Sequence, residues 1–141
     1  MERRLTTIFA ADMVGYSRLM EADEIGTLNR QKIHRRELID PALDQHHGRI
    51  VKTTGDGILI EFPSVVEAVQ CGVAIQRAMT RREKDVHEEK QIQYRIGINL
   101  GDVLVEEDGD LYGDGVNVAA RLEQMAEPGG ICISGTTFDH L

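Results

Sequence analysis

The sequence has no tryptophan, and aromatic residues make up only 4% of its 141 residues. This argues against a platform of stacked aromatics for single-stranded nucleic acid. No apolar run approaches the roughly 18 residues that a membrane helix needs, so we expect no membrane span in this chain. The two cysteines, Cys71 and Cys132, are too few for a disulfide framework and lie in apolar runs. They indicate buried thiols in a reducing compartment and predict a cytoplasmic location.

Basic residues are also fewer than acidic ones. Sixteen basic residues against 24 acidic ones give a net charge of −8. We therefore expect no binding to duplex nucleic acid, which requires a basic surface. Any phosphate ligand must be held by a local device, such as metal ions or backbone amides. The composition, 41% hydrophobic and 28% charged, is that of one ordinary globular domain.

Hydrophobic periodicity predicts a mixture of strands and helices. We expect helices over 17–46, with a kink or restart at Pro41, over 65–80 after a Ser64 cap, and over 116–126. A turn at Gly101-Asp102 should separate the fourth strand from the fifth. This order predicts an α+β fold of the ferredoxin-like or polymerase-palm kind, a mixed sheet with its helices mainly on one face. The expected strands cover 5–11, 49–54, 58–62, 92–100, 103–105 and 131–134.

Two aspartates follow or interrupt strand-like segments. Asp12 ends an apolar run before a glycine-containing turn, and Asp56 lies between two glycines at a hairpin tip. Each has an ordinary structural explanation, as a capping residue or as half of an Asp-Gly turn. If the two strands pair, however, the carboxylates would lie side by side and would require divalent cations, with Mg²⁺ or Mn²⁺ favoured by oxygen ligands. Two such ions suit in-line phosphoryl chemistry.

The turn after Asp12 could hold phosphate through its backbone amides. The residues of this turn are Met13, Val14, Gly15, Tyr16 and Ser17.

Two further pairs of polar residues carry possible chemistry. Asn117 and Arg121 are four residues apart on one helix face, which is either solvated surface or a clamp on a transferring phosphate. Lys52 and Asp110 are ordinary surface charges when taken singly. Together they supply a donor and an acceptor that can read the ring nitrogen and exocyclic amine of adenine.

The order of four segments and their residue sequences carry more information than any single residue. Taken together they resemble the class III adenylate/guanylate cyclase catalytic domain in its bacterial form, across the chain from about Arg4 to its end. The segments are Phe9–Ser17, Val51–Gly57, Arg95–Gly101 and Asp110–Glu123.

The resemblance implies a role for each of these positions. Asp12 and Asp56 would bind two metal ions per active site, Mg²⁺ or Mn²⁺. Lys52 and Asp110 would specify the base, and their identities match the adenylate type, so that ATP is the expected substrate. Asn117 would lie near the ribose and Arg121 on the phosphate.

The resemblance also implies a particular assembly. Two catalytic domains would pair head to tail in a homodimer with two shared active sites. The metal-binding aspartates of each site would come from one chain, and the other four residues from its partner. The expected activity is an intracellular signalling adenylate cyclase, forming 3′,5′-cyclic AMP and pyrophosphate from ATP.

Two departures from the family pattern qualify this interpretation. The family usually has a further strand pair, often with a lysine for the terminal phosphates, so residues 1–141 are expected to be a catalytic domain truncated at its C-terminus. Tyr16 stands where phenylalanine is common. The alternatives are a non-catalytic cyclase-like module that binds nucleotide or dimerises, another palm enzyme such as a dinucleotide cyclase, and a structural ferredoxin-like domain.

Overall fold

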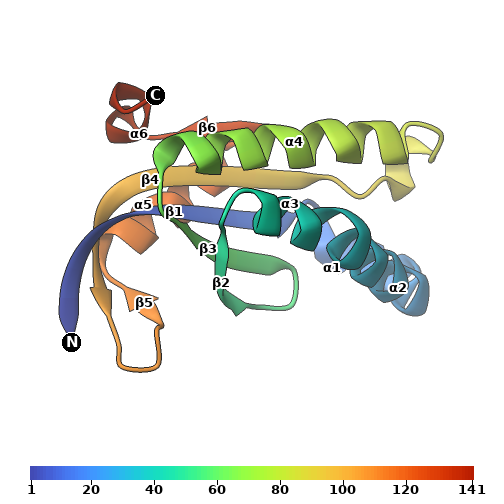
Figure 1. The fold of residues 1–141 in the computed structure, drawn as a ribbon. Helices are drawn as coiled ribbons and strands as arrows, with labels where there is room; N and C mark the ends of the chain where they lie inside the picture. Colours follow the sequence, from blue (N-terminus) through green and yellow to red (C-terminus); the bar gives the residue numbers. More distant parts are fainter.

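A six-stranded sheet forms the centre of the computed structural model, which describes all 141 residues (Figure 1). Five strands run in the order β2-β3-β1-β4-β5 with antiparallel pairing. The sixth, β6, pairs in parallel with β4. The predicted mixed sheet is therefore confirmed. The strands are β1 (Glu2–Met13), β2 (Arg49–Thr53), β3 (Gly57–Phe62), β4 (Tyr94–Val105), β5 (Leu111–Tyr112) and β6 (Ile131–Ile133).

Helices cover both faces of this sheet. Helices α1, α3 and α4 and a π-helical turn pack over the larger hydrophobic core, and α5 packs over a smaller core on the opposite face. None of the helices combines the length and apolar character needed to cross a bilayer. The α+β class is confirmed, with α5 as the one long helix on the second face. The helices are α1 (Tyr16–Ala22), α2 (Glu24–His34), a π-helical turn (Arg35–Ile39), α3 (Asp40–Gln45), α4 (Val65–Glu83), a 3₁₀ turn (Glu88–Lys90), α5 (Asp114–Met125) and α6 (Gly135–Asp139).

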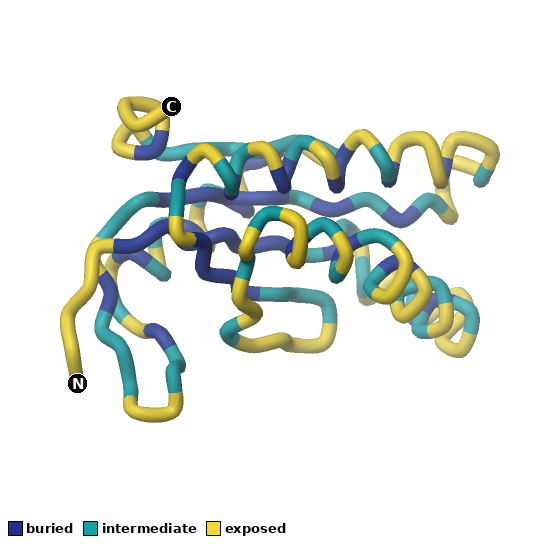
Figure 2. The backbone as a smooth tube through the Cα atoms, viewed as in Figure 1, coloured by how far each residue is buried: buried dark blue, intermediate teal, exposed yellow.

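Strand β1 shows how one sequence segment serves both cores. Successive side chains of a strand point to opposite faces. Phe9 and Met13 accordingly belong to the core beneath α4, whereas Ile8 and Ala10 belong to the core beneath α5. The centre of the sheet is buried on both sides (Figure 2). Asp12 lies four residues after Ile8 and two after Ala10, so its side chain points to the same face of the sheet, the α5 face.

Two features predicted from the sequence, the helix cap at Ser64 and the helix restart at Pro41, are present in the structure. The Ser64 hydroxyl accepts a hydrogen bond of 3.0 Å from the Glu67 N–H at the start of α4. Proline cannot donate a backbone hydrogen bond, and Pro41 stands in the first turn of α3, where that loss is tolerated. The π-helical turn directly before α3 lets the chain pass from α2 into α3.

One sequence prediction was wrong. Gly101-Asp102 is not a turn, because β4 continues through both residues to Val105. The reason is tertiary: β1 pairs with β4 along its whole length, and Gly101 and Asp102 lie opposite Thr6 and Leu5. The two-residue strand β5, which the sequence did not indicate, pairs with the far end of β4.

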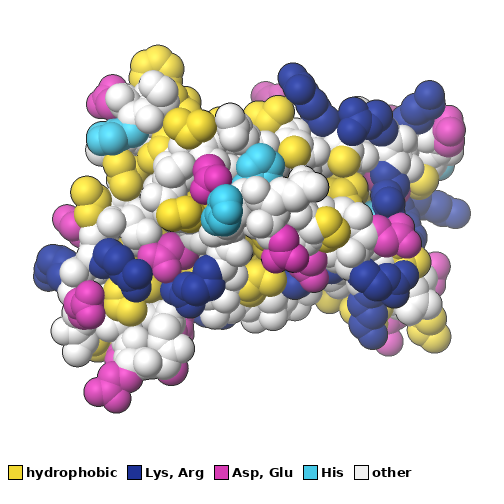
Figure 3. Space-filling model, viewed as in Figure 1, with side chains coloured by type: hydrophobic (Ala, Val, Ile, Leu, Met, Phe, Trp, Pro, Cys, Tyr) yellow, Lys and Arg dark blue, Asp and Glu magenta, His cyan; other side chains and the backbone are white.

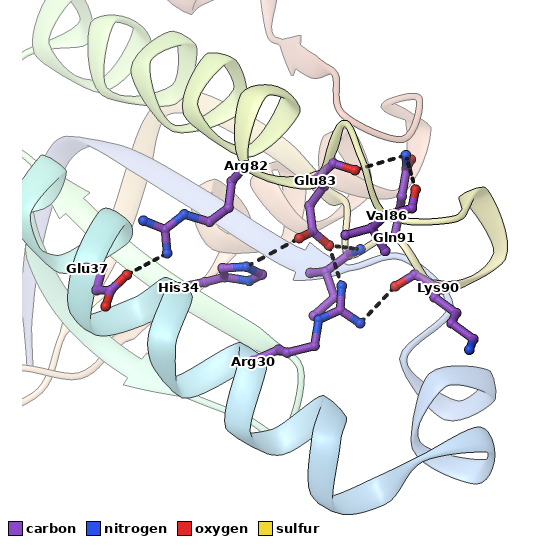
Figure 4. A network of polar contacts seen from close by, with 9 residues as sticks. Arg30, His34, Glu37, Arg82, Glu83, Val86, Lys90 and Gln91 are labelled. Atoms are coloured by element: carbon purple, nitrogen blue, oxygen red, sulfur yellow. Dashed lines mark hydrogen bonds and ion pairs between the residues drawn. The ribbon is translucent and has the colours of Figure 1, made fainter.

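A network of polar contacts ties α2 to α4 and to the segment before β4 (Figure 4). The buried carboxylate of Glu83 accepts hydrogen bonds from Arg30 and from the Ile92 N–H. Arg30 also donates to the Lys90 carbonyl at 2.9 Å. The His34 ring lies 3.7 Å from Glu83, but burial lowers the pKa of this histidine. Arg30 is therefore the cation that compensates Glu83, and its contacts tie α2 to α4 and to the segment before β4.

Close packing of α5 on the sheet depends on Gly97. A Cβ atom at this position would overlap the backbone nitrogen of Glu123 and the carbonyl oxygen of Ala119. The helix backbone therefore rests directly on the backbone of β4. Only glycine allows this approach, because any side chain would push α5 away from the sheet.

We predict that Gly97→Ala destabilises the protein by about 1–3 kcal/mol, because overpacking against a backbone cannot be relieved by side-chain rotation. Chemical denaturation would measure the change. Gly135→Ala is the matched control, since no atom lies within 4 Å of a Cβ at that position. An equal loss of stability in both variants would contradict the close approach.

Candidate active site

The two predicted metal ligands are brought together by the pairing of β1 with β3. Asp12 lies opposite Gly57, the residue that follows Asp56. The Met13 N–H donates to the Asp56 carbonyl at 3.1 Å, which fixes the hairpin turn beside the end of β1. The condition that the sequence left open, pairing of the two segments, is met.

Two charged residues without an assigned role complete this cluster. Arg95, on β4, places its Nε 3.5 Å from Asp12 Oδ1. Glu123, on α5, is 6% exposed. Burial, hydrogen bonding to Asp12 and the nearby negative charge raise the pKa of Glu123 to about 8. The folded chain therefore holds Glu123 protonated at neutral pH.

The donor set in this cluster fits a divalent cation. Two carboxylate oxygens of the cluster, Asp12 Oδ1 and Glu123 Oε2, are buried and accept no hydrogen bond from an N–H or hydroxyl group of the chain. A buried carboxylate oxygen without a donor is costly, and a hard cation such as Mg²⁺ or Mn²⁺ is a suitable partner for it. No three acidic, histidine or cysteine side chains form a complete metal cage, so the protein offers only part of a coordination shell.

The backbone N–H groups of the turn after Asp12 fall into two sets, those already hydrogen-bonded within the chain and those available to a ligand. The N–H groups of Met13 and Val14 donate to the carbonyls of Asp56 and Gln93, at 3.1 and 2.8 Å. They therefore position the turn and cannot also donate to a phosphate. Gly15 adopts a left-handed conformation (φ 64°) at the start of α1. The amides of Gly15, Tyr16 and Ser17 lie where a helix has no internal acceptors, so they are the ones available to a ligand.

Lys52 and Asp110 meet although they come from β2 and from the loop before β5. Lys52 Nζ lies 3.1 Å from Asp110 Oδ1 and 5.0 Å from the centre of the Tyr112 ring. Hydrogen bonding from the Tyr112 hydroxyl and from Lys52 lowers the pKa of Asp110. Asp110 is thus an ionised acceptor beside a charged donor, with an aromatic side chain next to both.

Asn117 and Arg121 are exposed on α5. Arg121 is not among the residues that form ion pairs within the chain. Arg121 and Glu123 are two residues apart on the same helix. Successive residues of an α-helix are rotated by about 100°, so these two side chains point in nearly opposite directions. Because Glu123 faces Asp12 of its own chain, Arg121 faces away from it.

Sequence reasoning gave no role to Arg95 or Glu123. A signal was present for Glu123: it lies four residues after the buried Ala119 and so falls on the core-facing side of α5. An acidic residue on a buried helix face needs an explanation. Arg95 shares a strand face with Gly97 and Asn99, but which helix covers that face could not be read from the sequence.

Known proteins resemble this chain over nearly its whole length. Residues 2–141 match the family described as the adenylate and guanylate cyclase catalytic domain. The chain belongs to this family. The resemblance noted in the sequence is therefore confirmed, and with it the assignment to a family of cyclase enzymes.

Individual relatives extend this comparison. The cyclase domain is 52% identical over its whole length to a Rhizobium meliloti protein assigned as adenylate cyclase 3, and covers 24% of it. It is 34% identical to an adenylate cyclase of Streptomyces coelicolor, again over its whole length, covering 35% of that protein. The chain thus spans only about a quarter to a third of these curated relatives.

A solved structure gives the corresponding comparison of folds. The crystal structure of an adenylate/guanylate cyclase/hydrolase from Silicibacter pomeroyi superimposes with a TM-score of 0.89 at 57% identity. The match covers 99% of the cyclase domain and 80% of that chain. Close agreement at this identity supports the fold.

Protonation of Glu123 predicts how stability depends on pH in the metal-free protein. The unfolded chain releases this proton near pH 4.5, whereas the folded chain holds it to about pH 8. Raising the pH through this interval therefore favours unfolding. Glu123→Gln should lose less stability than the parent between pH 5 and 8, as measured by chemical denaturation in EDTA. The exposed Glu127→Gln is the control; if both variants follow the parent curve, Glu123 is not protonated in the fold.

Proposed function

We propose that this cyclase domain converts ATP to 3′,5′-cyclic AMP and pyrophosphate, at active sites formed between two copies of the chain. The observation that carries the proposal is the arrangement around α5. Glu123 packs against Asp12 within the chain, whereas Arg121 points outward from the same helix. A phosphate held at Asp12 and Asp56 could be reached by Arg121 only from a second molecule.

Asp12 and Asp56 would hold two divalent ions, Mg²⁺ or Mn²⁺, with phosphate oxygens of the substrate completing the coordination. This suits Mg²⁺, which is commonly bound by one or two carboxylates together with substrate phosphates. When bound, the metals lower the pKa of the ribose 3′-hydroxyl and neutralise the triphosphate. The amides of Gly15, Tyr16 and Ser17 would donate to the phosphates from the adjoining turn.

The reaction itself requires mainly positioning and charge stabilisation. The 3′-oxygen attacks the α-phosphorus in line, loses its proton, and displaces pyrophosphate as the bond to the bridging oxygen breaks. Arg121 of one chain would donate charged hydrogen bonds to the α-phosphate as negative charge develops there. Asn117, on the same face of α5, would orient the ribose, so that the attacking oxygen is held in line.

The Lys52–Asp110 pair supports ATP as the substrate. The Asp110 carboxylate, whose pKa is lowered by its donors, is suited to accept from the exocyclic amine of adenine. Lys52, 3.1 Å away, would donate to a ring nitrogen. Guanine presents a carbonyl and an N–H at the corresponding edge, which would leave the lysine and aspartate facing the wrong partners.

A mixing experiment tests the shared site. Asp12→Ala and Arg121→Ala should each abolish or greatly lower cyclic AMP formation, with Arg121→Ala reducing turnover by about 10²–10³ as for other groups that stabilise a developing anion. Mixed together, the two variants should recover activity, because each mixed dimer contains one intact site. Mixing Asp12→Ala with Asp56→Ala is the control and should give no recovery, since both lesions fall on the same half-site. Failure of the first mixture to recover would contradict the shared site.

Base recognition is tested by comparing kcat/KM for ATP and GTP. The parent should prefer ATP, and Asp110→Ala should lower this preference by about 10–100-fold, the usual effect of losing a hydrogen bond to a charged group. Glu107→Ala, an exposed acidic residue of the same loop, should keep the parent's preference. Equal use of both nucleotides by the parent would argue against the adenine assignment. Absence of any cyclic product from the parent would instead support the non-catalytic alternative.

A further inference from the structure

A cavity of about 220 Å³ lies on the face of the sheet opposite α5, between the sheet and the helical segment formed by α2 and the π-helical turn. Its inner wall is apolar and belongs to the larger core. The side chains of this wall are Phe9, Ile39, Ile58, Ile60, Ile75 and Ile96. This volume is large enough for several waters or for a small organic molecule.

Polar residues border the rest of the cavity. Lys32 and Arg35, three residues apart on one helix face, lie on one side, and the hairpin residues Thr54 and Asp56 lie on the other. Gln31 connects the two sides by donating a hydrogen bond of 3.0 Å to the Gly55 carbonyl. Basic side chains gather at the end of the molecule where α2 and α4 lie (Figure 3). The cavity therefore combines an apolar interior with a cationic border.

Tyr94 also lines this cavity and carries an unused donor. Its side chain is only 6% exposed, and its hydroxyl group has no hydrogen-bond partner. A buried hydroxyl without a partner costs free energy. Arg35 and Tyr94 both line the cavity, which places the two groups near one another. Lys32 forms no ion pair, and Arg35 uses its Nε on Asp40 at 3.0 Å. Lys32 and the Tyr94 hydroxyl thus border the cavity without an acceptor of their own.

The cavity is separate from the proposed cyclase site. Asp12, Lys52 and Asp110 do not line it, and Arg121 lies on the helix that covers the other face of the sheet. The only shared element is the hairpin turn that carries Asp56. A ligand here would therefore not occupy the position of the nucleotide.

We propose that this cavity is a binding site for a small amphipathic carboxylate of roughly ten non-hydrogen atoms, within the limits set by the cavity volume. The apolar tail would lie among the isoleucines. The carboxylate would accept hydrogen bonds from Lys32, Arg35 and the Tyr94 hydroxyl.

Titration with octanoate tests the proposal. The titration is carried out in EDTA without nucleotide, and binding is followed by NMR of protein labelled in amide nitrogen and isoleucine methyl groups. Saturable shifts should appear at the isoleucine methyls of the cavity and at the amides of residues 53–57. Ile25, exposed on α2 and outside the cavity, should not respond. 1-Octanol should bind at least about tenfold more weakly, because it lacks the charge-assisted hydrogen bonds. Absence of saturable shifts, shifts on another face, or equal binding of the alcohol would overturn the proposal.

Paired variants test the assigned donors. Lys32→Glu should weaken octanoate binding by about tenfold or more, while Arg36→Glu, the same charge change at an exposed neighbour outside the cavity, should change it less than about twofold. Tyr94→Phe should weaken binding while leaving the free energy of unfolding unchanged or higher, since it removes only an unpartnered hydroxyl. Equal effects of the Lys32 and Arg36 variants, or unaltered binding by Tyr94→Phe, would contradict the assignment. Because no readout involves catalysis, failure here would leave the proposed cyclase activity intact.

Discussion

The contact between α5 and the backbone of Gly97 is the constraint on which the remaining geometry depends. It sets the height of the helix above the sheet, and with it the depth at which Glu123 is buried. Because residues of one helix keep a fixed angular relation, burying Glu123 against Asp12 also directs Arg121 outward. A single close approach therefore fixes both the inner wall of the acidic cluster and the outward clamp that we assign to a partner.

The acidic cluster illustrates why a binding site can be an unfavourable arrangement for the protein alone. Asp12, Asp56 and Glu123 gather at one place, and Arg95 forms an ion pair with Asp12 there. Part of the repulsion is relieved by keeping Glu123 protonated, and part of the polar surface remains without a partner. Such strain is expected at functional sites, where a ligand supplies what the fold lacks. Divalent metal and triphosphate together are the chemistry that fits this deficit.

The sheet separates two kinds of pocket. On the α5 face, the strand ends present charged groups, and the nucleotide site that we propose would be completed by a second molecule. On the α4 face, the same strands present isoleucines, and the cavity beside Tyr94 is bordered by cations of α2 and the π-helical turn. The alternation of side chains along β1 and β4 makes this division possible, since neighbouring residues such as Tyr94 and Arg95 face opposite sides.

The sequence by itself determined the order of strands and helices, the cap at Ser64, the helix restart at Pro41, and the residues that could carry chemistry. These are local properties, set by periodicity, turn composition and short motifs. Only the tertiary structure decided that β4 runs through Gly101-Asp102, that Asp12 lies beside Asp56, and that Lys52 contacts Asp110. It also decided that Arg95 and Glu123 join the acidic cluster. Each of these depends on strand register or helix placement, which arises from contacts between residues far apart in the chain and leaves no periodic trace along it.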